Sequence, residues 1–288
     1  SSGQELLAEG VGVNGVVKDP SRLADALIRA KGSLKGIDCA HAALPEEAAY
    51  VFSMHVPEDS SHEQILRMIE FELEGRVPIA PAAAVYDFNV IHRSVEGGGE
   101  EIGVAVFPRE LAEAYVGAFS AAGIRLLSLE VEAGSIARAV SSGREDEPTT
   151  LLVDFGRART GFAVLKRGIP IFTSTVSVGG EVMTRAVMQE LSLSAEEAEA
   201  FKDNKGLLVD RADKRAEKAP GIEALSSAAS ALADEVVRHY HYWDTRRDEH
   251  GERMTPIARV FLVGGTSNLR GLADYIAARV QAPTVRPD

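Results

Sequence analysis

The chain has 288 residues, of which 45% are hydrophobic and 26% are charged, so it can form one large or two modest globular domains with a substantial core. Its net charge of -12 argues against nucleic acid as a partner, because binding a phosphate backbone requires a basic surface. The single cysteine, Cys39, cannot form an internal disulfide and favours a reducing compartment. No apolar run approaches the ~20 residues of a membrane helix, and no signal-peptide pattern opens the chain, so we expect a cytosolic protein without direct membrane insertion.

The first motif in chain order is Gly10-Val-Gly-Val-Asn-Gly15, which matches the dinucleotide fingerprint G-x-G-x-x-G. That fingerprint requires a strand immediately before it and a helix that starts inside it. Val16 and Val17 instead indicate extended chain, and the next helix signal is Asp19-Pro20, an N-cap followed by proline at the first helical position. We therefore interpret the motif as a glycine-rich loop. A dinucleotide enzyme stays an alternative that a strand and helix in those places would support.

The first half of the chain alternates helix and strand patterns up to a polar linker. Gly97-Gly98-Gly99 lies between glutamates and predicts a flexible hairpin loop, and the polar run Ser141–Pro148 predicts the linker. The predicted elements are a helix from Asp19 to Gly32, strands over 37–44 and 49–56, a helix from the capping box Ser61-His-Glu-Gln64 to about Gly75, strands over 85–92 and 102–107, a helix over 109–122, a strand over 125–129 and a helix over 132–140.

Beyond the linker the pattern changes to three strands with tight connections, followed by alternating helix and strand. This order is that of a ribonuclease-H-like half of the actin fold. A charged stretch, Asp203–Lys218, looks mobile. The predicted elements are strands over 151–154, 161–166 and 171–178 forming an antiparallel meander, a helix opened by Gly179-Gly180, a helix from the capping box Ser194-Ala-Glu-Glu197, a long helix over 222–245, a strand over 260–263, a helix over 268–280 and an edge strand over 283–285.

Two short segments, Leu151-Leu-Val-Asp-Phe-Gly156 and Phe261-Leu-Val-Gly-Gly-Thr-Ser-Asn268, carry the strongest chemical signal. Each is an apolar run that ends in a small or acidic residue and glycine, which is how a buried strand brings bare backbone to a phosphate or nucleoside. Asp154 can orient Mg²⁺ through water, and Gly156 lets the following turn approach a ligand, although a plain hairpin turn is the alternative. The pair predicts a nucleotide cleft of the actin and sugar-kinase type.

Three further groups extend this predicted site. Gly179 and Gly180 lie where strand gives way to helix and would offer unpaired amides to an anion, with a simple helix-entry turn as the alternative. Glu199 and Lys202 share one helical face and could bracket a ribose or form a solvated ion pair. Gly264-Gly265-Thr266 precedes a helix and could lie against a flat purine or be a tight turn.

Other constellations do not predict chemistry. His239 and His241 are two apart on a helix, so they point to opposite sides and cannot chelate one metal, and we interpret them as solvated or core histidines. No G-x-S-x-G elbow, Cys/His pair or carboxylate dyad is present for nucleophilic or glycosidic catalysis. Trp243 is interpreted as an anchor of the long helix.

These motifs together resemble the PilM family of actin-like type IV pilus assembly proteins, from about Val16 to the end of the chain. Segment 151–156 resembles the family's second phosphate motif, and segment 261–272 its adenosine motif. The likeness extends to the strand-to-helix passage 169–181, to Ser194-Ala-Glu-Glu-Ala-Glu-Ala-Phe-Lys202 as the nucleotide-side helix, and to Phe71-Glu-Leu-Glu-Gly-Arg-Val-Pro78 with Tyr86-Asp-Phe88 as part of an inserted subdomain.

The resemblance implies an α/β fold of two ribonuclease-H-like halves around an ATP and Mg²⁺ cleft. Residues 1–148 would form the first half, with an α+β insertion near 36–117, and residues 149–288 the second, with a helical subdomain near 179–222. The site residues would be Asp154 (Mg²⁺ through water), Gly156, Gly179, Gly180, Glu199, Lys202, Gly264, Gly265 and Thr266, with no catalytic residue.

The resemblance also implies a role as a cytoplasmic ATP-binding scaffold, peripheral to the inner membrane, with weak or no turnover. It would bind the N-terminal tail of a PilN-type inner-membrane protein in a groove between the first core subdomain and the insertion, and would link it indirectly to pilus assembly ATPases. An extended tail fits the strand-rich insertion. An active small-molecule kinase of the same superfamily and a type II secretion scaffold are the alternatives.

Two departures from the family pattern affect the phosphate site. The family's first phosphate motif, an Asp-Ile-Gly-Ser type hairpin, normally precedes everything seen here, so we expect the first half to lack its opening strands. Arg157 and Arg159 stand where small polar residues are usual after the second motif. They either meet phosphate directly or mark a lost site.

Overall fold

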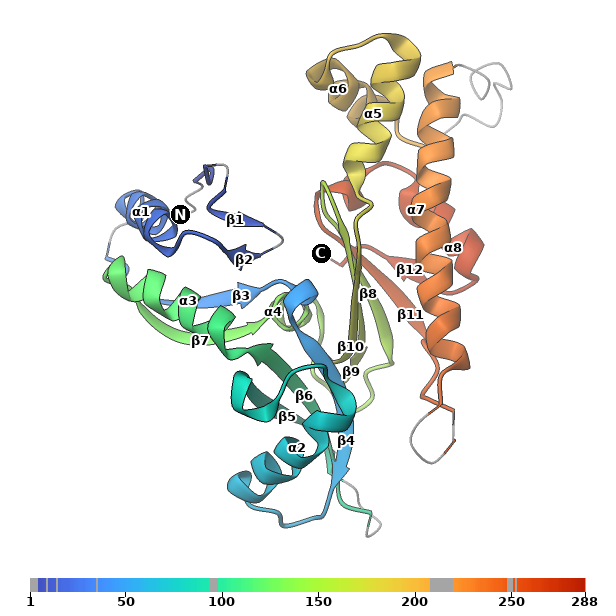
Figure 1. Ribbon diagram of the computed structural model, residues 1–288. Coiled ribbons are helices and arrows are strands. Elements are labelled where there is room, and N and C mark those ends of the chain that lie inside the picture. The colour runs from blue at the N-terminus through green and yellow to red at the C-terminus, as the bar shows by residue number, and fades with distance from the viewer. Residues whose placement is uncertain are drawn as a thin grey trace. The chain divides into compact units, whose positions relative to one another are not determined.

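The computed structural model describes residues 5–8, 10–13, 15–34, 36–93, 98–207, 220–247, 251 and 253–287. By its internal contacts the chain divides into two compact units, and each is described by itself (Figure 1). The first unit comprises Ser1–Ala139 with Ile169–Thr173, and the second comprises Val140–Gly168 with Ser174–Asp288.

The first unit contains every element predicted for it, to within two residues at each end. The short 3-10 turns η1 and η2 were not predicted. In chain order the elements are β1 (Gly12–Val13), β2 (Val16–Val17), α1 (Pro20–Gly32), β3 (Cys39–Leu44), η1 (Glu46–Ala48), β4 (Tyr50–Val56), α2 (His62–Arg76), η2 (Pro81–Ala83), β5 (Ala84–Arg93), β6 (Glu100–Pro108), α3 (Arg109–Ala121), β7 (Arg125–Val131) and α4 (Glu132–Val140).

The glycine-rich motif near the N-terminus is part of a β-hairpin. Strands β1 and β2 pair antiparallel, with Gly12 opposite Val17 and Val13 opposite Val16, while Asn14 lies outside the described residues. Helix α1 starts only after the hairpin, where the Asp19 carboxylate accepts a hydrogen bond of 3.0 Å from the Arg22 amide. A strand-to-strand connection replaces the strand-to-helix turn of a dinucleotide fingerprint, so the dinucleotide alternative is wrong. The loop interpretation holds only in part, because Gly12–Val13 of the motif forms strand β1, which was not predicted.

The middle part of the first unit's sequence forms a three-stranded sheet with its own core. The strands lie in the order β4-β6-β5, all antiparallel, and helix α2 covers one face. Alternating residues of β4 and one stripe of α2 meet in this core, as period-2 and period-3.6 patterns require. The predicted capping box at Ser61 and Gln64 is confirmed by both of its hydrogen bonds. The loop predicted at 97–99 joins β5 to β6, with Gly97 outside the described residues.

The rest of the first unit is built on the parallel pair β3 and β7. Helix α3 packs on β7 and on α1, around a small core of Phe119, Ala122 and Ile124. The two ends of the range 36–117, β3 and α3, therefore pack with β7 and α1, whereas β4, α2, β5 and β6 share the separate core described above.

The second unit is built on a five-stranded sheet in the order β10-β9-β8-β11-β12, with α5, α6, α7 and α8 beside it (Figure 1). Strands β8 and β9 are antiparallel, and β11 is parallel to both β8 and β12. Its elements are β8 (Thr150–Phe155), β9 (Thr160–Lys166), β10 (Ile169–Val176), α5 (Gly180–Leu191), α6 (Ala195–Lys205), α7 (Pro220–Thr245), β11 (Arg259–Val263), η3 (Gly265–Asn268), α8 (Leu272–Val280) and β12 (Thr284–Val285). Of β10, the part Ile169–Thr173 is grouped by its contacts with the first unit.

Most predicted elements of this unit are confirmed, including the buried strand β8 and the second capping box at Ser194. The helix predicted over 268–280 is wrong at its start. Residues Gly265–Asn268 form a 3-10 turn, and α8 begins at Leu272 because Gly271 has a φ of +83° that an α-helix cannot continue through. Of the stretch predicted as mobile, 203–205 belongs to α6, and 208–218 lies outside the described residues.

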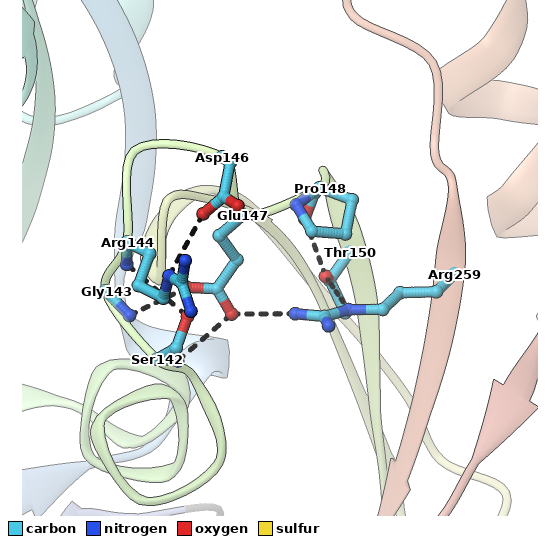
Figure 2. A network of polar contacts seen from close by, with 8 residues as sticks. All are labelled: Ser142, Gly143, Arg144, Asp146, Glu147, Pro148, Thr150 and Arg259. Atoms are coloured by element: carbon cyan, nitrogen blue, oxygen red, sulfur yellow. Dashed lines mark hydrogen bonds and ion pairs between the residues drawn. The ribbon is translucent and has the colours of Figure 1, made fainter.

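The polar run predicted as a linker, Ser141–Pro148, is held by a polar network around the Glu147 side chain (Figure 2). The Glu147 side chain is only 3% exposed and accepts hydrogen bonds from the amides of Ser142 (3.2 Å) and Gly143 (2.8 Å). Arg259 on β11 donates to Glu147 (2.7 Å) and to the Thr150 hydroxyl (2.8 Å). Burial raises the pKa of Glu147, but these amide and guanidinium donors outweigh burial and lower it. The connection is thereby fixed to the sheet of its own unit.

The long helix α7 is anchored at its C-terminal end by Trp243, as predicted. The indole is 1% exposed and donates a hydrogen bond of 2.9 Å to the Thr255 carbonyl. His239 is a half-buried core residue that stacks on Phe162 at 3.8 Å, and its neighbour His241 is exposed. Along the described part of the chain, no helix is both long enough and apolar enough to cross a bilayer.

The buried His239 should make stability depend on pH. Burial lowers the pKa of this imidazole below the ordinary 6.5, although the Glu235 carbonyl that contacts Nδ1 opposes the shift. Because the unfolded chain then binds the proton more tightly, the stabilisation is present above pH 6.5 and is lost as the pH falls through the folded value.

We expect His239→Gln to reduce the slope of unfolding free energy between about pH 8 and pH 5, measured by denaturant titration. The matched control is His241→Gln, which replaces an exposed histidine of the same helix. Equal slopes for both variants would contradict the assignment.

Candidate functional site

The ends of β8 and β11 bring two of the predicted site segments together. The strands are parallel with Asp154 opposite Val263, so Asp154 lies beside Gly264. Gly264 has a φ of +81°, and a Cβ there would lie 2.2 Å from Asp154 Oδ1 and 2.6 Å from the Phe155 carbonyl oxygen. Only glycine fits between the carboxylate and the chain that follows β11. The half-buried Asp154 side chain is thereby packed against backbone.

Gly156 connects these two segments to the start of helix α5. Its carbonyl oxygen accepts hydrogen bonds from the Gly180 amide (3.0 Å) and from the Thr266 hydroxyl (3.2 Å). Gly180 and Thr266 also touch each other, since a Cβ on Gly180 would lie 2.2 Å from Thr266 Oγ1. Three motifs that are far apart in the sequence therefore meet at one carbonyl group.

The amide of Gly180 is not free, which corrects the role predicted for that residue, while the role predicted for the Gly179 amide stays a prediction. The Gly180 amide donates to Gly156, the Glu181 amide donates to the Arg157 carbonyl at 2.8 Å, and the Val182 amide donates to Gly179. The two glycines serve instead to let the chain segments approach, because a Cβ on Gly179 would lie 2.5 Å from the Arg157 carbonyl oxygen. The amides of Gly180, Glu181 and Val182 therefore already have protein acceptors.

Glu199 and Lys202 form an ion pair in which the lysine is buried and the glutamate is partly exposed. Lys202 Nζ lies 2.6 Å from Glu199 Oε2 and donates to the Thr184 hydroxyl at 3.1 Å, and the Thr184 hydroxyl donates to Glu199 Oε1 at 2.5 Å. The Lys202 side chain is 9% exposed and that of Glu199 is 47% exposed. Burial raises the pKa of Glu199, but hydrogen bonds from Lys202 and Thr184, followed by the charges of Lys202 and Arg157, lower it overall. The surface ion-pair interpretation is therefore wrong for Lys202.

A cavity of about 760 Å³ opens above these groups, within the range of small-molecule sites. Five of the nine predicted site residues line it: Gly180, Glu199, Lys202, Gly265 and Thr266. The other four, Asp154, Gly156, Gly179 and Gly264, are not among its lining residues. Gly156 contacts the lining residue Gly180, and Gly179 contacts the lining residue Arg157. A Cβ on Gly265 would meet no atom within 4 Å, so this glycine faces open space. The remaining lining residues are Arg157, Glu181, Thr184, Arg185, Met188, Ala195, Glu196, Asp203, Asn268 and Leu269.

Thr184, which lines the cavity and contacts the ion pair, was not identified from the sequence. It is buried, lies one turn after Gly180 on α5, and holds both members of the ion pair on α6. A signal was available, since a polar residue on the apolar stripe of a helix that opens with Gly-Gly needs a partner. Glu181 and Arg185 were also missed. They pair at 2.8 Å, one turn apart along α5.

No group of three metal-ligating side chains was found in the part of the chain that the structure describes. Asp154 is the carboxylate predicted to serve Mg²⁺, and it packs against Gly264 rather than lining the cavity. Contact of Asp154 to Mg²⁺ through water stays a prediction.

The chain is similar to one protein family over nearly its whole length and to several solved structures. A family model described as "Type IV pilus assembly protein PilM" matches residues 2–286. A solved PilM-PilN type IV pilus biogenesis complex is similar with a TM-score of 0.69 and 21% identity, over 96% of this chain and 77% of that chain. MreB 5 of Spiroplasma citri bound to AMPPNP has a TM-score of 0.56 and 14% identity, over 96% and 73%. The ethanolamine utilization protein EutJ from Carboxydothermus hydrogenoformans has a TM-score of 0.53 and 17% identity, over 96% and 72%.

At these identities the three structures show the fold alone, and it is the actin-like fold expected from the sequence. No curated protein sequence is significantly similar to the chain.

Proposed function

The chain belongs to the PilM family of actin-like type IV pilus assembly proteins, and on that premise we propose that it is an ATP-binding scaffold that holds the N-terminal tail of a PilN-type membrane protein. The scaffold would work in the cytoplasm at the inner membrane, joined to it by that partner. Its link to the pilus assembly ATPases would be indirect. No residue in the cavity is assigned a catalytic role, so the nucleotide would be structural or regulatory.

The observation that carries the nucleotide proposal is the convergence of four separate sequence motifs on one cavity. The segments that contain Asp154, Gly180, Lys202 and Gly265 meet there through the direct contacts described above. The residues present fit a nucleotide. The open backbone at Gly265 can face a purine, the Glu199 and Lys202 pair can hold ribose hydroxyls, and Asp154 can hold Mg²⁺ through water, which when bound would neutralise phosphate charge.

The tail proposal rests on the first unit. The resemblance implies a groove beside the inserted subdomain, and we propose β4, α2, β5 and β6 as that subdomain. In the β4-β6-β5 sheet the outer strands β4 and β5 each have one edge that pairs with no described strand. An extended tail can bind such an edge by adding a strand, using main-chain hydrogen bonds for affinity and side-chain contacts for specificity. The PilM-PilN complex is the similar structure that supports a PilN-type partner.

Calorimetric titration tests both parts of the proposal. The chain is titrated with Mg-ATP and, separately, with a synthetic PilN-type N-terminal peptide. We expect both to bind. Asp154→Asn keeps the shape packed against Gly264 but removes the charge, so it should weaken Mg-ATP by about tenfold, the effect of one lost charged contact, and leave the peptide unaffected.

Peptide binding without ATP binding would support the partner and contradict the nucleotide site. ATP binding without peptide binding would contradict the scaffold role and favour a kinase, to be examined with a panel of small-molecule substrates. Equal loss of both ligands in Asp154→Asn would indicate damage to the fold, which circular dichroism of the variant distinguishes.

A further inference from the structure

The cavity needs a positive charge if it is to hold the phosphate chain of a nucleotide, and the start of α5 does not supply it. A helix N-terminus binds anions through its free amides. Here the amides of Gly180 and Glu181 donate to the carbonyls of Gly156 and Arg157, at 3.0 and 2.8 Å. The counter-charge must therefore come from a side chain or from a metal ion.

Among the residues that the structure describes, three cationic side chains line the cavity, and two of them already have partners. Lys202 is held by Glu199 at 2.6 Å and by Thr184 at 3.1 Å, with its side chain only 9% exposed. Arg185 pairs with Glu181 at 2.8 Å. Arg157 is exposed, and no ion pair or hydrogen bond of its guanidinium was found among the residues that the structure describes.

The main chain of Arg157 is held in place by a hydrogen bond and by close packing. Its carbonyl oxygen accepts the Glu181 amide, and Gly179 packs directly on the same carbonyl group. The residue thus lies at the turn between β8 and β9 and is held against the start of α5. Its guanidinium lines the cavity and has no hydrogen bond or ion pair with a residue that the structure describes. Arg157 also contributes to the lowered pKa of Glu199, after burial and the closer groups Lys202 and Thr184, which places its charge within electrostatic reach of the cavity wall.

We propose that Arg157 is the phosphate ligand of this cavity and that it provides, within the chain itself, positive charge that a divalent cation would otherwise provide. This inference rests on the proposed nucleotide site. An arginine fork can donate two parallel hydrogen bonds to phosphate oxygens, and such charge-assisted bonds are about twice as strong as neutral ones. ATP binding should consequently persist when Mg²⁺ is removed.

The test is a set of titrations with ATP in excess Mg²⁺, with ATP in excess chelator, and with adenosine. The variants are Arg157→Gln, which keeps a polar side chain without charge, Arg157→Lys, which keeps the charge without the fork, and the matched control Arg185→Gln. We expect Arg157→Gln to weaken ATP by about tenfold or more in chelator and by less in Mg²⁺. Arg157→Lys should lose an intermediate amount, Arg185→Gln less than about threefold, and adenosine should be unaffected by all three.

The outcomes distinguish this inference from the proposed nucleotide site on which it rests. If the wild type binds ATP in chelator and Arg157→Gln binds it equally well, the role of Arg157 is overturned and the nucleotide site stands. A wild type that binds ATP only with Mg²⁺ also overturns the inference. A wild type that binds ATP under neither condition overturns the nucleotide site itself. Equal losses in Arg157→Gln and Arg185→Gln would indicate a general charge effect and overturn the specific role.

Discussion

Replacement of Gly264 by alanine is expected to destabilise the second unit strongly, whereas replacement of its neighbour Gly265 is expected to leave the fold intact and impair ATP binding. The two glycines are adjacent at the end of β11 but differ in surroundings. Gly264 has φ +81° and ψ 166°, a conformation found almost only for glycine, and its Cβ would strike Asp154 and Phe155. Backbone strain and overpacking together should cost about 2–5 kcal/mol of unfolding free energy.

Gly265 has no such constraint. A Cβ at this position meets no atom within 4 Å, and its backbone has no positive φ. Gly265→Val should therefore change the unfolding free energy by less than about 1 kcal/mol. Because Gly265 lines the cavity, the new side chain should occupy space needed by the ligand and weaken Mg-ATP by at least about tenfold, without effect on the peptide.

Denaturant unfolding of both variants and calorimetry of Gly265→Val measure these effects. Gly264→Ala tests the packing, and Gly265→Val tests the ligand. A Gly265→Val variant that folds normally and binds Mg-ATP as the wild type does would remove the purine-facing role from this segment. A Gly264→Ala variant as stable as the wild type would contradict the close approach of β8 and β11.

The contrast between these glycines illustrates what the sequence could predict. The pattern of an apolar run ending in Gly-Gly predicted that bare backbone is needed there, and the resemblance predicted which ligand it serves. Neither could assign one glycine to packing and the other to the cavity. That division depends on Asp154, which is 110 residues away in the sequence and reaches Gly264 only through the parallel pairing of β8 with β11.

Local signals located most helices and strands because the chemistry that starts and stops them is local. The Asp19 N-cap and the capping boxes at Ser61 and Ser194 all form as predicted, and α4 has the predicted bounds. The start of α8 was predicted wrongly because the apolar spacing continues through Gly271. This glycine adopts a positive φ, so the helix begins only after it.

Polar segments were predicted less well, for a physical reason. Composition shows that a residue is polar but not whether its partner is water or protein. Glu147 lies in a run that resembles a solvated linker, yet it is buried against Arg259, which follows 112 positions later. Lys202 likewise has a partner at the helical spacing of a surface pair, and only Thr184 on the facing helix shows that the pair is partly buried.

The partly buried pair leads to an asymmetric expectation. Glu199→Ala should destabilise the protein by about 2–3 kcal/mol, because it leaves the Lys202 ammonium with 9% exposure and only Thr184 as a partner. The value is below the ~3–5 kcal/mol of a fully buried pair because the Glu199 side of the pair reaches water. Lys202→Met fills a similar volume and leaves a carboxylate that is 47% exposed, so it should cost less than about 1 kcal/mol.

The double variant and the pH dependence identify the cause of this asymmetry. Glu199→Ala with Lys202→Met removes the buried charge together with its partner, so it should recover most of the stability lost in Glu199→Ala alone. The folded-state pKa of Glu199 is lowered from 4.5, so the stabilisation is complete above pH 4.5 and is lost as the pH falls through the folded value. Lys202→Met should lose this dependence, measured by denaturant unfolding under acidic conditions. If Glu199→Ala is no more harmful than Lys202→Met, water reaches the ammonium, and the pair contributes no more than the surface ion pair that the helical spacing alone would suggest.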